Sequence, residues 1–297
     1  MAGITGAGGA VSDLPQRRRA AALIAACSIE LSPREVLSET VLAEHLDSGA
    51  TVFVSHPASV THHDIVAACA RLRRAGLIPV PHVAARRLAS FTQARDFLQR
   101  AAAEAHITSA IVVGGDPDRP MGPFADGLDL LTTGVVEESG LAEVILPGYP
   151  EGHPRIDSRT LAKALRSKLA LARARGLHTS LVSQFAFEAA PIRRWLAALR
   201  GQDILCPVRV GVAGPASIAT LAKFAVRCGI GASLRALGRG HTAFARIMVE
   251  AGPDRLIDAL AAAEDPKAPV ESLHLFAFGG LRRTADWIRA RTASHSG

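Results

Sequence analysis

Aromatic residues make up only 4% of this 297-residue sequence, with a single tyrosine and two tryptophans. Its arginines and lysines are dispersed rather than gathered in blocks. The chain therefore lacks the basic runs and stacking side chains that are typical of proteins that bind single-stranded nucleic acid, and we expect no nucleic acid partner. No hydrophobic run approaches the roughly 20 residues of a membrane span, so we expect no membrane partner either.

The four cysteines are far apart and form no Cys-x-x-Cys or Cys/His ligand spacing; they are Cys27, Cys69, Cys206 and Cys228. We therefore expect neither a metal site nor a disulfide framework, and a cytoplasmic location. A G-x-S-x-G elbow is also lacking, which disfavours hydrolysis through a serine nucleophile. No G-x-G-x-x-G follows a strand-like run, which weakens the alternative of an open, doubly wound sheet.

Eight short strand-like runs recur along the chain, each followed by a longer segment of helical periodicity. This count predicts a single-domain α/β protein, a (β/α)8 TIM barrel over residues 21–292, after a flexible tail over residues 1–20. The expected strands are 23–30, 51–56, 77–83, 109–116, 143–150, 178–187, 207–214 and 273–280. The expected helices between them lie at 33–49, 60–76, 90–105, 127–140, 157–176, 190–201 and 215–229.

Polar residues stand where most of these strands end, and in such a barrel those ends form the active site. They are Glu30, Ser55, His56, His82, Asp116, Tyr149, Glu151, His153 and Gln184. The loop after the fifth strand, GYPEGHP, contains the only tyrosine, between residues that restrict the backbone. Five other histidines are expected on the surface or in helices, namely His62, His63, His106, His241 and His274; the first two read as a helix start.

Glu30, Asp116 and Gln184 interrupt otherwise apolar runs, where an unpaired polar group costs roughly 2 kcal/mol. Two carboxylates facing one cavity suggest separate duties. Glu30 has the more apolar neighbours, so we expect its pKa to be raised and the residue to act as an acid. Asp116 follows two glycines and is expected to stay ionised.

The motifs follow one another in the order of a known family. SIELSP (28–33) is similar to its first-strand motif with a catalytic Glu, PHV (81–83) to its Pro-His segment, and GGDP (114–117) to its Arg-Gly-Asp turn. GYPEGHP (148–154) resembles its Tyr-Pro-x-x-His-Pro signature, SQFAFE (183–188) its Gln motif, and CPVRVGV (206–212) its seventh strand. Over about residues 25–290 the chain thus resembles the methylenetetrahydrofolate reductase family.

The resemblance implies reduction of 5,10-methylenetetrahydrofolate to 5-methyltetrahydrofolate, a one-carbon step toward methionine biosynthesis, with NADH or NADPH as co-substrate and FAD as cofactor. Glu30 and Asp116 would be catalytic, and both would contact the folate together with Gln184. The residues implied for FAD are Ser55, His82, Gly115, Asp116, Phe124, Tyr149, His153 and Lys168. Family members are commonly dimers or tetramers, so a homo-oligomer is expected. The net charge of +7 suits anionic ligands.

Several positions depart from the family pattern. Gly114 replaces the usual Arg, Phe124 a usual Tyr, and Ile218 a folate-stacking Phe. These changes leave two alternatives open. The first is a flavin-independent or substrate-shifted folate enzyme on the same barrel, and the second is a barrel that binds folate or a partner without catalysis. The choice between NADH and NADPH also stays open.

Overall fold

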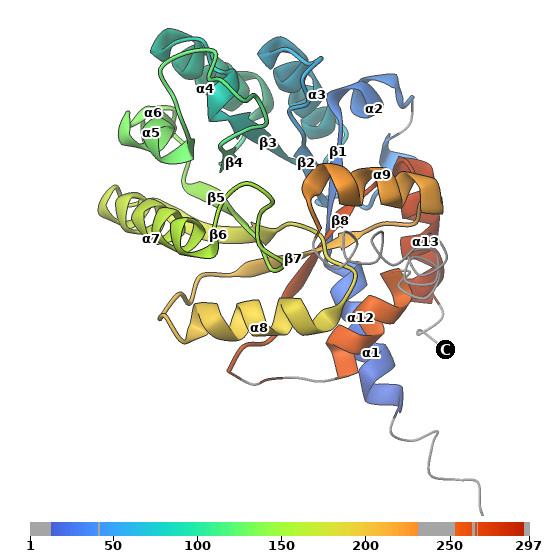
Figure 1. Ribbon diagram of the computed structural model, residues 1–297. Coiled ribbons are helices and arrows are strands. Elements are labelled where there is room, and N and C mark those ends of the chain that lie inside the picture. The colour runs from blue at the N-terminus through green and yellow to red at the C-terminus, as the bar shows by residue number, and fades with distance from the viewer. Residues whose placement is uncertain (1–12, 41, 231–252, 263–264, 266, 294–297) are drawn as a thin grey trace, which may run out of the picture.

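The computed structural model describes residues 13–40, 42–230, 253–262, 265 and 267–293. His241 lies outside these residues, and so does most of the expected N-terminal tail. Within the described residues, strands and helices alternate around a central sheet (Figure 1).

Eight parallel strands close into a barrel in chain order, with β1 paired to both β2 and β8. The predicted (β/α)8 barrel is therefore confirmed. The strands are β1 (Ser28–Leu31), β2 (Thr51–Val54), β3 (Ile78–Ala84), β4 (Ser109–Val113), β5 (Glu143–Gly148), β6 (His178–Ser183), β7 (Val208–Ala213) and β8 (Ser272–Phe276).

Helices surround the sheet and connect its strands. They are α1 (Asp13–Ala25), α2 (Pro33–Ser38), α3 (His62–Arg74), α4 (Phe91–Ala105), α5 (Gly127–Thr132), α6 (Val135–Glu138), α7 (Ser158–Ala174), α8 (Ala189–Arg200), α9 (Ile218–Cys228), α12 (Pro253–Ala262) and α13 (Leu281–Ala293). Short 3-10 turns, η1 (Leu42–Glu44) and η2 (Ala85–Arg87), follow α2 and β3. Thr61 caps α3 with a capping box, which confirms the helix start predicted at His62.

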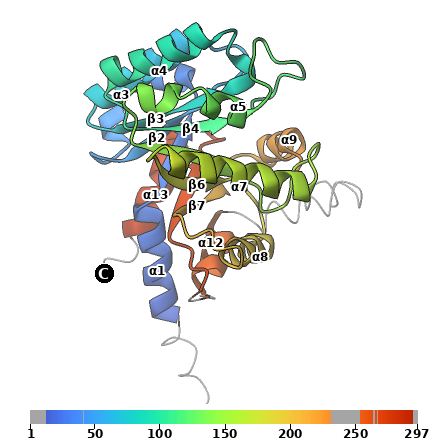
Figure 2. The same cartoon turned by 90° about the vertical axis from the view of Figure 1, so that its left-hand side faces the viewer.

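The sequence prediction was wrong at the N-terminus. Residues 13–20, expected in the tail, and residues 23–25, expected in the first strand, form α1 instead. The helix lies below the barrel against α12 and α13 (Figure 2), where Ala20, Leu23 and Ile24 are buried. The side chain of Gln16 donates a hydrogen bond to the carbonyl of Asp258 (3.0 Å). The Ala- and Leu-rich run is compatible with a strand or a helix. It forms a helix here because its apolar residues pack against α12 and α13.

Two helices that were expected to be continuous are divided. In its described residues the segment 33–49 contains α2 and η1, and the segment 127–140 breaks at Gly134 between α5 and α6. Gly134 has a φ of 83°, which L side chains rarely adopt, and a Cβ there would also collide with the Arg175 guanidinium. The break is therefore a property of the glycine.

The barrel interior contains both an apolar cluster and polar side chains. Phe53, Val80, Ile111, Ile145 and Val182 form an interior cluster separate from the core between sheet and helices. Residues paired across parallel strands point to the same face, and Glu30 is paired with Phe53. In the same way His82 is paired with Ile111, and Ser28 is paired with His274. Beside the apolar cluster, these four polar residues thus share the interior.

Candidate functional site

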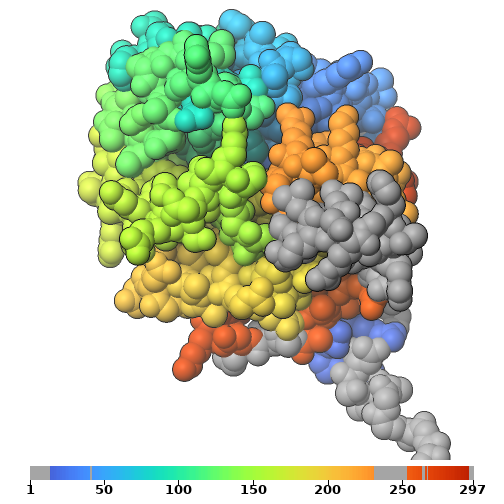
Figure 3. All heavy atoms as spheres, in the orientation of Figure 1, coloured from blue at the N-terminus to red at the C-terminus, as the bar shows by residue number. Residues whose placement is uncertain are grey.

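A cavity of about 1340 Å³ opens at the carboxyl ends of the strands. The predicted residues that line it are His56, His82, Gly115, Asp116, Tyr149, Glu151, His153, Lys168 and Gln184. They come from β2 to β6, the loops after them and α7. In the space-filling view (Figure 3), α9 borders the segment after β5, and Gly229 at its end lies against Pro154.

Glu30 lies beside this cavity rather than among its lining residues, and it contacts two histidines. Its Oε2 atom is 3.2 Å from Nε2 of His82 and 3.5 Å from Nε2 of His274. The side chain of His82 is 15% exposed and that of Glu30 is 19% exposed. Burial acts to raise the pKa of Glu30, but the charge of His82 and the contacts with both imidazoles outweigh it and lower the pKa to about 2. The expected raised pKa is therefore wrong in direction.

His274 was expected on the surface or in a helix, and it is fully buried in β8. Its Nδ1 atom lies 2.9 Å from the hydroxyl of Ser28, and its ring contacts Phe53 at a centroid distance of 4.6 Å. Burial lowers the pKa of His274 although Glu30 acts in the opposite direction. In LHLF (273–276) the histidine alternates with apolar residues, and this pattern of an inward-facing strand position was the available signal.

Asp116 is held by two arginines that sequence reasoning missed. Arg87 donates a short hydrogen bond to its carboxylate, and Nη2 of Arg227 lies 3.6 Å from it. Burial acts to raise the pKa of Asp116, but the hydrogen bond and charge of Arg87 outweigh it, so the pKa is lowered. The expectation that Asp116 stays ionised agrees with this direction. Gly115 forms the turn with a φ of 92°.

The single tyrosine is placed by the loop after β5. Its ring meets that of His153 edge to face at a centroid distance of 5.3 Å. Burial raises the pKa of Tyr149 and lowers that of His153. Lys168 reaches the same cavity from α7, and burial lowers its pKa despite the nearby Asp126. Tyrosine, histidine and lysine thus form one wall of the cavity.

Two predicted cofactor contacts are not among the residues lining the cavity. The hydroxyl of Ser55 donates to the carbonyl of Leu31 at 3.3 Å. Phe124 is buried and its ring packs edge to face against Phe91 at 5.1 Å. The remaining predicted cofactor residues do come together: His82, Gly115, Asp116, Tyr149, His153 and Lys168.

A cluster of five phenylalanines at the ends of β6 and β8 and on α9 was not predicted. It consists of Phe185, Phe187, Phe224, Phe276 and Phe278. Phe224 and Phe278 stack at 4.0 Å with an interplanar angle of 12°, and Phe276 contacts His274 edge to face at 4.9 Å. The repeated Phe-Ala-Phe in QFAFE (184–188) and LFAFGG (275–280) was the available signal. The aromatic residues are few but concentrated.

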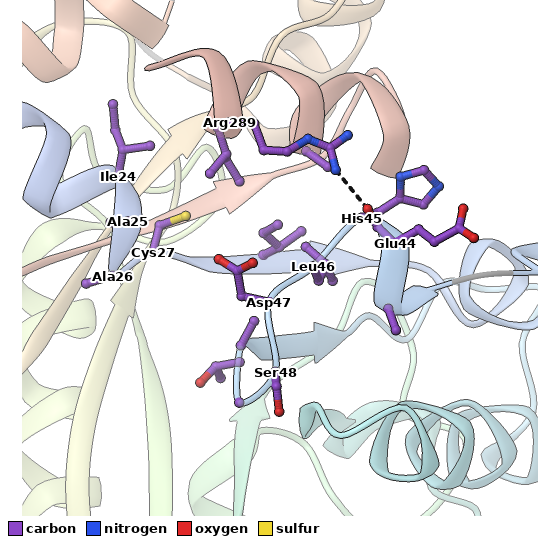
Figure 4. A pocket seen from close by; sticks show the side chains of 17 residues that line it. Ile24, Ala25, Ala26, Cys27, Glu44, His45, Leu46, Asp47, Ser48 and Arg289 are labelled. Carbon is purple, nitrogen blue, oxygen red and sulfur yellow. Dashed lines mark hydrogen bonds between the residues drawn. The ribbon is translucent and has the colours of Figure 1, made fainter. Parts of the chain in front are cut away.

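A second cavity of about 290 Å³ lies at the opposite, amino-terminal end of β1 and β2, against α13 (Figure 4). Cys27, Asp47 and Ser48 are among its lining residues, and Arg289 donates to the carbonyl of Glu44 at 2.8 Å. Conserved chemistry in this fold class belongs to the other end. The larger cavity is therefore the candidate functional site.

This chain is a (β/α)8 barrel whose candidate site is a cation-lined cavity with a partly buried carboxylate–imidazole cluster beside it, and an aromatic cluster lies at neighbouring strand ends. No model of a known protein family matches it. Among solved structures it is similar to a DHPS from Yersinia pestis (11% identity over 92% of this chain and 96% of that chain, TM-score 0.48). It is also similar to dihydropteroate synthase from Thermus thermophilus (14%, 90% and 92%, TM-score 0.44). Likeness at these values says nothing about activity. In the described part of the chain, no helix has the length and apolar character needed to cross a membrane.

Proposed function

We propose that this protein reduces 5,10-methylenetetrahydrofolate to 5-methyltetrahydrofolate with NADH or NADPH. The observation that carries the proposal is the gathering of motif residues at one cavity. Four successive strand ends supply residues that line it in the order of the family's motifs, namely His82, Asp116, Tyr149 and Gln184. The carboxylate of Glu30 lies 3.2 Å from the imidazole of His82. Order along the chain and position around the barrel thus agree.

The size of the cavity and its cationic lining residues support a dinucleotide bound beside a folate. Its volume of about 1340 Å³ exceeds the upper end of ordinary small-molecule pockets. Arg86, Arg155, Lys168 and Arg227 are among its lining residues. Cationic side chains of this kind suit the diphosphate of a dinucleotide and the glutamate carboxylates of a folate. The phenylalanine cluster at neighbouring strand ends offers a flat apolar surface for an aromatic ring.

In the proposed reaction the five-membered ring of the folate opens as the bond between the methylene carbon and one nitrogen breaks. That nitrogen takes a proton, and the methylene group, now an iminium carbon, takes a hydride. The proton would come from the Glu30–His82 pair, of which His82 lines the cavity, and Gln184 and Asp116 would orient the pterin. Positioning the donor against the acceptor is the main contribution of a rigid barrel site.

The residues fit FAD in part. His82, Gly115, Tyr149, His153 and Lys168 would hold it, and FAD when bound supplies a hydride carrier between nicotinamide and folate. A second candidate, direct transfer from nicotinamide without flavin, is favoured by two observations. The Ser55 hydroxyl is satisfied by the backbone, and Phe124 is buried against Phe91.

The visible absorption spectrum of the purified protein tests both candidates. With FAD added, flavin bands that bleach with NADH under anaerobic conditions and recover with methylenetetrahydrofolate would support the flavin route. A colourless protein that oxidises NADH in a folate-dependent manner, unaffected by FAD, would support direct transfer. A protein that forms no methyltetrahydrofolate with NADH or NADPH would overturn the proposal.

A further inference from the structure

A chain of polar contacts runs through the barrel interior from Ser28 to the cavity. The hydroxyl of Ser28 lies 2.9 Å from Nδ1 of His274, whose Nε2 lies 3.5 Å from Oε2 of Glu30. The same Oε2 atom lies 3.2 Å from Nε2 of His82. Of these four residues, His82 lines the cavity. The chain of contacts therefore ends at the site where a ligand would bind.

The hydrogen-bond roles along this chain follow from the ionisation of Glu30. An ionised carboxylate only accepts hydrogen bonds, so Nε2 of His274 must carry the hydrogen that it directs at Glu30. Burial favours the neutral form of His274, which leaves Nδ1 as an acceptor for the Ser28 hydroxyl. The Glu30 carboxylate thus fixes the tautomer of His274, the Ser28 hydroxyl supports it from the other ring nitrogen, and His274 in turn fixes the position of the carboxylate.

Among the described residues, the titratable groups that act on this chain of contacts include His56, which interacts with His82. Phe53 packs edge to face against both imidazoles, at centroid distances of 6.2 Å for His82 and 4.6 Å for His274. On β7, Arg209 disfavours a second positive charge at His274, and on α9 the Cys228 thiol is near enough to interact with Glu30. The interior of such barrels is usually filled with branched apolar residues. A set of four polar residues there, of which Ser28 and His274 are fully buried, therefore needs a functional explanation.

We infer that Ser28, His274, Glu30 and His82 act as one unit, in which His82 exchanges a proton with the ligand in the cavity and His274 is a positioning residue. The catalytic role of His82 rests on the proposed function. In that step a proton leaves a ring nitrogen of His82 and forms the N–H bond of the nitrogen released from the methylene carbon. Solvent in the open cavity then returns a proton to the imidazole. Glu30, being ionised, holds the imidazole rather than giving up a proton of its own.

The first test does not depend on activity. The carboxyl carbon of Glu30 is followed by ¹³C NMR against pH in the full chain, with Glu30→Gln used for assignment. In the unchanged protein it should stay ionised down to about pH 2. In His274→Leu its midpoint should move toward the ordinary value near 4.5, while His274→Gln, which keeps a donor, should restore part of the difference.

His178→Gln is the matched control for this titration, because His178 is exposed at the amino-terminal start of β6 and should leave the Glu30 midpoint unchanged. Ser28→Ala gives a second, milder disturbance should His274→Leu fail to fold. If the titration midpoint of Glu30 is the same in the unchanged protein, His274→Leu and Ser28→Ala, the inference that the four residues act as one unit is wrong.

The second test uses turnover of methylenetetrahydrofolate. His82→Gln should lower kcat by about 10²- to 10⁴-fold with a KM within a few-fold of the original, as for loss of a general acid. Ser28→Ala and His274→Gln should shift the pH profile of kcat with smaller losses. If His82→Gln keeps the original kcat and pH profile, His82 is not the proton donor. If the unchanged protein has no turnover, the proposed function fails, and the titration alone decides whether the unit exists.

Discussion

The indole of Trp195 on α8 packs so closely over Gly148 at the end of β5 that a Cβ on this glycine would collide with its six-membered ring. Both residues line the large cavity. Trp195 therefore shapes the wall of the candidate site.

Gly148→Ala should accordingly destabilise the protein by about 1–3 kcal/mol, because the ring must move or the strand must shift. Urea denaturation at neutral pH measures this difference. Gly114→Ala is the control, since a Cβ at Gly114 would meet nothing within 4 Å and should change the free energy of unfolding by less than about 0.5 kcal/mol. Equal stability of the two variants would contradict the prediction.

The Arg87–Asp116 pair predicts unequal costs for removing its two members. Asp116→Ala leaves a guanidinium that is only 10% exposed without its carboxylate, whereas Arg87→Met leaves a carboxylate that is 51% exposed. We expect a loss of about 2–3 kcal/mol for Asp116→Ala and under about 1 kcal/mol for Arg87→Met. The exposed pair Arg155–Asp118 provides the control, and Asp118→Ala should cost less than about 0.5 kcal/mol. The order of the three losses in chemical denaturation is the deciding result.

Glu30 should make stability depend on pH in the acid range. Because the fold lowers its pKa from 4.5 to about 2, its contribution is complete above pH 4.5 and is lost as pH falls toward 2. The loss is on the order of 3 kcal/mol. The free energy of unfolding of Glu30→Gln should therefore fall less steeply with pH across this window than that of the unchanged protein, as measured by urea midpoints at several pH values. Parallel curves for the two proteins would refute the assignment.

His56 should act in a higher window. Burial, followed by the nearby His62, lowers its pKa from 6.5 to about 4, so the fold favours the neutral ring. Its contribution is present above pH 6.5 and is lost as pH falls from 6.5 toward 4. We expect the free energy of unfolding of His56→Gln to vary less across this range than that of the unchanged protein. His63→Gln, on the exposed face of α3, is the matched control.

The stacked pair Phe224–Phe278 predicts an effect on ligand binding. If this surface receives an aromatic part of the folate, Phe224→Ala should raise KM about tenfold with kcat within about twofold, the size expected for one lost aromatic contact. Phe91→Ala serves as the control, because Phe91 is 56% exposed at the start of α4 and packs against Phe124, not against the phenylalanine cluster. A KM that changes equally in both variants would place the binding surface elsewhere.

Periodicity and motif order were enough to predict the barrel and nine of the residues that line the cavity. The runs from 51 to 213 alternate clearly with helices, and the ends of β2 to β6 supply polar residues to the same edge. The contacts around Glu30 could not be predicted from the sequence. Ser28 and His274 are 246 residues apart in the chain and meet only through the pairing of the first and last strands. The sign of the Glu30 pKa shift depends on these contacts, so apolar neighbours in sequence predicted it wrongly. Arg87 was missed for the same reason, since its partner Asp116 lies on the next strand–loop unit.

Closure of the barrel through β1 and β8 has a consequence for synthesis of the chain. At the usual 5–20 residues per second, β1 waits on the order of tens of seconds before β8 emerges from the ribosome. During this interval β1 is an unpaired edge, which is a template for pairing with other chains. It has only four residues, and one of them is the charged Glu30. The carboxylate that the finished barrel encloses is thus, in the growing chain, a charge that discourages aggregation at its open edge.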